Sequence, residues 1–156
     1  MRRLNVIQAM ILAASLTLAA APALAVGPWT SPLENEPDYR EAEALIKAGE
    51  WTRALPPLDR LVKQHPKAPE VLNYLGFVHR KLKDYPTSKR FYDAALQVKS
   101  DYLPALEYQG EWYLETGDLA AAKANLQRLE QLCGQCHEWN DLAESIRKVA
   151  PDALPK

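Results

Sequence analysis

Cys133, Cys136 and His137 form the one short motif in this chain that could do chemistry. Read as C-x-x-C-H, the motif matches the attachment site of c-type haem, in which both cysteines form thioether bonds and the histidine ligates iron. The same cysteines could instead form a structural disulfide, or a redox-active dithiol of the kind found near helix N-termini. The second axial ligand of a haem iron would have to be His65 or His79, or be absent. Both methionines lie at positions 1 and 10, near the N-terminus, and so could not serve as that ligand.

We therefore predict a disulfide between Cys133 and Cys136 and no cofactor, with haem c and a dithiol as the alternatives. A zinc site is a weaker interpretation, since only His137 is near enough to join the two sulfurs. Elsewhere, Glu107, Glu111 and Glu115 follow one another at intervals of four and predict a charged, solvent-facing side of a helix. No arrangement of a nucleophile with a base, and no glycine-rich phosphate loop, is present, so we predict that the protein is not an enzyme.

The N-terminus has the pattern of a secretory signal peptide, which we place at residues 1–25. Arg2 and Arg3 precede an uncharged apolar run, and Ala23-Leu24-Ala25 supplies small residues of the kind a signal peptidase accepts. An uncleaved membrane anchor is the alternative. We expect a mature chain that starts near Val26, is periplasmic or secreted, and has no stable membrane insertion after cleavage.

The charge of the mature chain argues against nucleic acid as a partner. The signal removes two of the 19 basic residues and none of the 20 acidic ones, which leaves a net charge of −3. Such a balance gives no general attraction to phosphate backbones. Residues 26–36, rich in proline and without apolar periodicity, predict an extended linker.

A repeat of 34 residues organises the remainder. Small residues recur at Ala42, Gly76 and Gly110, within stretches that have the apolar spacing of helices. Large apolar residues recur at Leu58, Tyr92 and Leu126, and Asp84 and Asp118 stand where a helix N-cap is expected. After the third unit, Trp139, Leu142, Ile146 and Val149 share one face of a further helix.

These positions resemble the signature of the tetratricopeptide repeat family. The resemblance implies an all-α fold, a right-handed α-α superhelix of three helical hairpins closed by a capping helix. The expected domain covers residues 37–150, with repeats at about 35–68, 69–102 and 103–136, a capping helix at 137–150 and a tail at 151–156.

In that family the first helix of each unit lines a concave groove, which implies that a protein or peptide binds there. The partner-binding residues expected from the register are Tyr39, Arg40, Asn73, Tyr74, Phe77, Arg80, Lys81, Glu107, Tyr108 and Glu111. A basic second unit beside an acidic third unit would orient the partner. The resemblance favours a non-enzymatic scaffold; the alternative is a haem or dithiol redox protein that uses Cys133, Cys136 and His137, or an assistant in cytochrome maturation.

Overall fold

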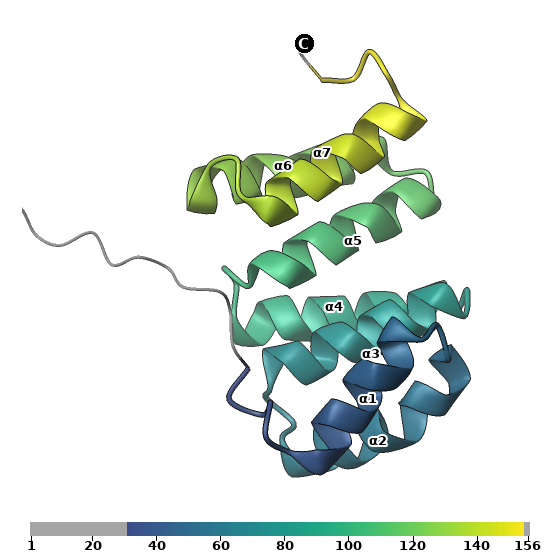
Figure 1. Cartoon of the computed structure of the whole chain (residues 1–156). Coiled ribbons are helices and arrows are strands. Elements are labelled where there is room, and N and C mark those ends of the chain that lie inside the picture. The colour runs from purple at the N-terminus through teal and green to yellow at the C-terminus, as the bar shows by residue number, and fades with distance from the viewer. Residues whose placement is uncertain (1–30, 155–156) are drawn as a thin grey trace, which may run out of the picture.

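The computed structural model describes residues 31–154, and within that range the chain forms seven α-helices and no strand. Successive helices pair as antiparallel hairpins that stack along the molecule from the blue end to the yellow end of Figure 1. This is the all-α helical repeat fold expected from the sequence. The helices are α1 (Pro37–Lys47), α2 (Trp51–Gln64), α3 (Pro69–Lys81), α4 (Tyr85–Val98), α5 (Leu103–Glu115), α6 (Leu119–Cys133) and α7 (His137–Val149).

Local sequence fixes where the second helix of a hairpin begins. Asp84 caps α4 by accepting a hydrogen bond from the backbone N–H of Thr87, and Asp118 caps α6 in the same way from Ala121. Both caps confirm the predicted N-cap role, in which a carboxylate satisfies a backbone donor that has no partner within the helix. The turn before each cap contains a residue in the left-handed region, Lys83 at φ 64° and Gly117 at φ 87°.

The helices of the second hairpin approach each other closely at Gly76. A Cβ atom at this position would lie 2.6 Å from a ring carbon of Tyr92, which is fully buried. The Ser88 hydroxyl donates to the Gly76 carbonyl across the same crossing, at 2.7 Å. Small residues at this register position are therefore required by the contact between α3 and α4, as the repeat predicted.

The last helix covers the end of the stack. Helix α7 packs on both α5 and α6, and Leu142 and Ile146 are completely buried in that contact. The methyl groups of Leu142 lie directly over Gly110, at a place where a Cβ atom would approach to 2.5 Å. Val149 differs from its predicted place on the buried face, because it is 63% exposed at the C-terminal end of α7.

The predicted signal peptide, residues 1–25, lies outside the described residues, as does the first half of the predicted linker. Among the helices from α1 to α7, none is long and apolar enough to cross a membrane.

Candidate functional site

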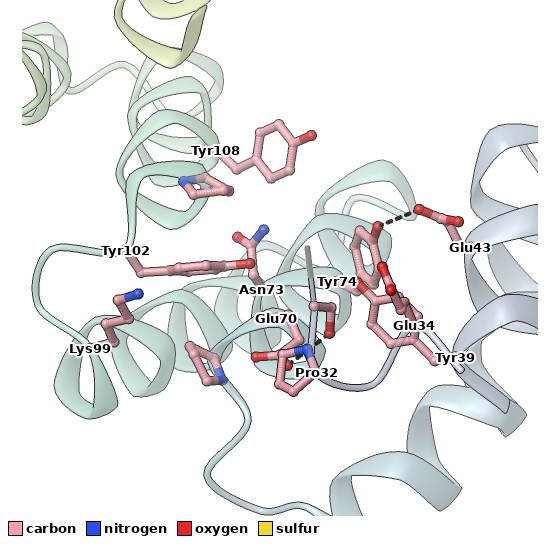
Figure 2. A pocket seen from close by; sticks show the side chains of 13 residues that line it. Pro32, Glu34, Tyr39, Glu43, Glu70, Asn73, Tyr74, Lys99, Tyr102 and Tyr108 are labelled. Atoms are coloured by element: carbon pink, nitrogen blue, oxygen red, sulfur yellow. Dashed lines mark hydrogen bonds between the residues drawn. The ribbon is translucent and has the colours of Figure 1, made fainter. Parts of the chain in front are cut away.

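A hollow of about 550 Å³ opens between the first helices of the three hairpins and the chain that precedes α1 (Figure 2). Its wall combines aromatic rings, carboxylates and one buried amide. The lining residues are Ser31, Pro32, Glu34, Tyr39, Glu43, Pro69, Glu70, Asn73, Tyr74, Lys99, Tyr102, Pro104 and Tyr108.

Residues 31–36 form one wall of the hollow and do not extend away from the domain. Leu33 is buried against the first hairpin, and the Glu36 N–H donates to the Leu33 carbonyl in a tight turn. The Ser31 hydroxyl donates to Glu70 of α3 at 2.9 Å, the contact drawn beside Pro32 in Figure 2. The prediction of an extended linker is therefore wrong for these residues, because Leu33 gains burial by folding back onto the repeats.

Tyrosine side chains supply the apolar part of the wall. Tyr39 of α1 and Tyr74 of α3 contact each other with ring centroids 5.5 Å apart, and Tyr102 and Tyr108 face them across the hollow (Figure 2). Burial raises the pKa of all four phenols, that of Tyr108 to about 12. At neutral pH these hydroxyls therefore remain protonated and able to donate hydrogen bonds.

Asn73 places an unused hydrogen-bond acceptor in this wall. The side chain is 2% exposed, and its Oδ1 atom has no hydrogen-bond partner among the described residues. Leaving a buried amide oxygen without a partner costs about 1–3 kcal/mol. Such an atom is stabilised when a ligand supplies an N–H or O–H donor.

Arg80, predicted to face the groove, is buried instead. It is 1% exposed, and its guanidinium donates to Glu111 at 2.5 Å and to Glu115 at 3.1 Å. Its Cζ atom also lies 5.5 Å from the ring centroid of Phe77 and 5.9 Å from that of Tyr108. Arg80 therefore presents no basic charge to the groove, which corrects that part of the prediction: its charge is balanced by Glu111 and Glu115 of the third unit, whose side chains are 25% and 28% exposed.

Glu107 is also buried, which corrects the prediction of a solvent-facing acidic row. The residue is 7% exposed. Its burial is the largest cause that raises its pKa to about 9, and the nearby carboxylates of Glu111, Asp141 and Glu138 add to this effect. Arg80 lowers the pKa but does not offset these causes. Glu107 is accordingly a neutral carboxylic acid at pH 7.

The structure brings together only part of the predicted groove set. Tyr39, Asn73, Tyr74 and Tyr108 line the hollow. The other predicted groove residues do not line it: Arg40, Phe77, Arg80, Lys81, Glu107 and Glu111. Arg40 and Lys81 are exposed, and the Lys81 ammonium lies 5.0 Å from the Phe77 ring.

Several lining residues were absent from the predicted set. Glu34, Glu70, Lys99 and Tyr102 lie at helix starts or between helices, whereas the register of the repeat selects positions inside the first helices. A signal existed for Glu70, since it precedes Asn73 by three residues and so shares its face of α3.

The cysteine motif lies away from this hollow, between α6 and α7. Cys133 and Cys136 are at disulfide distance, with Cα atoms 5.7 Å apart. The imidazole of His137 is 82% exposed and 3.4 Å from the carboxylate of Asp141. None of the three residues lines the hollow, and residues 31–154 contain no group of three or more His, Cys, Asp or Glu side chains able to hold a metal ion.

Comparison with known proteins assigns the repeats. No curated protein matches the chain. Two family models described as tetratricopeptide repeat match it, one over residues 39–104 and the other over residues 104–132. The matched residues run from α1 almost to the end of α6 and so include all three hairpins. Repeats of this kind serve as protein–protein interaction scaffolds and are typically not enzymes. The chain belongs to the tetratricopeptide repeat family.

Proposed function

We propose that this protein is an exported, non-enzymatic scaffold that binds an extended segment of a protein or peptide partner in the hollow of Figure 2. The observation that carries the proposal is Asn73, whose Oδ1 atom is buried without a partner among residues 31–154, in a wall that also contains four tyrosines. Tyrosine rings give rigid apolar contact area at low entropic cost, and an amide oxygen accepts from a backbone N–H. Together they match an extended peptide better than a small reacting substrate.

Export is proposed from the N-terminal pattern of Arg2, Arg3 and the apolar run that follows. The mass of the protein purified from the producing cell tests it. A mature chain starting near Val26 is expected, and a full-length chain retained in the cytoplasm would contradict export.

The cysteines enter the proposal as a structural disulfide without a cofactor. The C-x-x-C-H pattern still allows haem c, for which both sulfurs would have to form thioethers. The same mass measurement separates the two: a disulfide lowers the mass by two hydrogens, and haem attachment raises it by one haem.

Site-specific photocrosslinking tests the binding surface. A photoreactive phenylalanine analogue at Tyr74 is expected to give a discrete adduct with the partner in the native cell. The same analogue at Gln97, exposed on α4 and absent from the hollow, is the matched control. The adduct should weaken when Tyr108→Ala is added to the Tyr74 probe. Equal adducts at both positions, or none at Tyr74, would contradict the proposal.

A further inference from the structure

Carboxylates dominate the charge of the hollow. Glu34, Glu43 and Glu70 line it, and among the described residues Lys99 is the one basic residue in its wall. Glu70 is 7% exposed and accepts a hydrogen bond from the Ser31 hydroxyl, but it forms no ion pair within residues 31–154. A buried carboxylate that lacks a cation is costly, and it gains stability when a positive group arrives.

The residues around the hollow respond to this negative charge. Burial is the main cause that raises the pKa of Tyr39 and Tyr74. The carboxylates of Glu43 and Glu70 raise the pKa of Tyr39 further, and Glu43 also raises that of Tyr74. The buried cation Arg80 does not line the hollow, and its guanidinium is paired with Glu111 and Glu115, although it does lower the pKa of Tyr108 against the effect of burial.

Asn73 adds an observation that is independent of charge. Its Oδ1 atom is a buried acceptor in the same wall as Glu70 and has no partner in the part of the chain that the structure describes. Ammonium and guanidinium groups have several hydrogen-bond donors and no acceptor. The faces of tyrosine rings also attract cations. A basic side chain therefore has the chemistry to pair with the carboxylate, donate to the amide oxygen and pack on the tyrosine rings.

We infer that the hollow receives a lysine or arginine side chain of an extended partner segment, with Glu70 as its ion-pair partner and Asn73 as a hydrogen-bond acceptor. This inference rests on the proposed function and adds the chemistry of the ligand. Acidic segments, purely apolar segments and the N-terminal part of this chain are the competing occupants.

Selection from random peptides displayed on phage tests the inference with the mature, full-length protein. Enrichment of lysine or arginine at one position of the selected peptides is expected. A selected peptide is then synthesised with Arg, Lys, Gln or Glu at that position, and its affinity is measured by fluorescence polarisation. The Gln peptide should bind at least about tenfold more weakly than the Arg peptide, and the Glu peptide more weakly still, with the difference reduced by salt.

Two variants locate the effect. Glu70→Gln keeps an acceptor for Ser31 but removes the charge, so it should weaken the Arg peptide and leave the Gln peptide nearly unchanged. Glu130→Gln is the matched control, because Glu130 is exposed on α6 and does not line the hollow. It should bind both peptides as the wild type does.

The outcomes separate this inference from the proposed function. Peptides that depend on Tyr74 but show no preference for a basic residue would overturn the inference and leave the binding function in place. If no peptide binds and the probe at Tyr74 gives no crosslinked partner in the cell, both the basic-ligand inference and the proposed binding function are refuted. Selection of acidic peptides, or exclusion of every peptide by the chain's own N-terminal segment, would also overturn the basic-ligand assignment.

Discussion

The buried guanidinium of Arg80 in α3 forms an ion pair with Glu111 of α5, whose side chain is 25% exposed, and so joins neighbouring hairpins. The Nη2 atom of Arg80 lies 2.5 Å from a carboxylate oxygen of Glu111, and Arg80 is 1% exposed. Glu115 binds the same guanidinium at 3.1 Å. The second and third repeats are therefore joined by charge as well as by apolar packing.

Replacing Arg80 by methionine should destabilise the protein. The change preserves most of the apolar stem but removes the cation of Glu111, while Glu115 keeps its contact with Lys83. Because the two carboxylates are 25% and 28% exposed, we expect a loss of about 1–3 kcal/mol, below the roughly 3–5 kcal/mol of a fully buried pair. Urea unfolding followed by circular dichroism measures the loss. The control is Lys89→Ala, which removes an exposed pair with Asp93 and should cost less than about 1 kcal/mol. Equal effects of the two changes would contradict a structural role for the pair of Arg80 and Glu111.

The helices and their caps could be predicted from the sequence because they depend on neighbouring residues. Asp84 and Asp118 act within one helical turn, and Gly76 recurs in register with Gly110. The burial of Glu107 could not be predicted in this way. Helical spacing places Glu107 and Glu111 on one face of α5, but only the packing of α7 and the approach of Arg80 decide that this face is covered.

The candidate site was predicted in part for a related reason. Tyr39, Asn73 and Tyr74 follow from the register of the repeat, since they lie inside first helices. The wall formed by residues 31–36 depends on a contact between Ser31 and Glu70, which are 39 positions apart in the chain. No local pattern specifies such a contact, and the proline-rich stretch by itself predicts an extended linker.

Gly110→Ala should loosen the capping helix. The new Cβ would lie 2.5 Å from a methyl carbon of Leu142, and overpacking of this kind costs about 1–3 kcal/mol. Alanine has a better helix propensity than glycine, which stabilises the folded protein by up to about 1 kcal/mol. We therefore expect a net decrease in the free energy of unfolding. Hydrogen exchange should show the loss of protection mainly in α5 and α7.

A double-mutant cycle with Leu142→Ala tests the cause. Because the smaller side chain removes the clash, the two changes together should cost less than the sum of their separate effects. Strict additivity would show that Gly110 is small for some reason other than contact with Leu142.

Replacing Cys133 and Cys136 by serine should lower stability modestly. Closing so short a loop contributes roughly 2 kcal/mol at most through chain entropy. Differential scanning calorimetry should show a lower melting temperature, and the wild type in reducing agent should match it. Peptide affinity should not change, because neither cysteine lines the hollow. Loss of binding in the double variant would give the cysteines a role that a structural disulfide does not explain.

Glu107 should make the protein less stable as the pH rises. Burial and the neighbouring carboxylates raise its pKa to about 9 in the folded protein, far above the ordinary glutamate pKa of 4.5. Above pH 4.5 the unfolded chain loses this proton while the folded protein keeps it. The folded state therefore binds more protons, and the free energy of unfolding falls as the pH increases towards 9.

Glu107→Gln removes this contribution because glutamine does not titrate. The variant should be more stable than the wild type at pH 7, by about 1–3 kcal/mol, and nearly equal to it at pH 4. Urea unfolding at a series of pH values gives the comparison. Glu130→Gln, on the exposed side of α6, is the matched control and should keep the wild-type pH profile. If Glu107→Gln follows the wild-type profile at every pH, the carboxyl is ionised in the folded protein. Burial and the carboxylates of Glu111, Glu138 and Asp141 would then not be what controls its protonation.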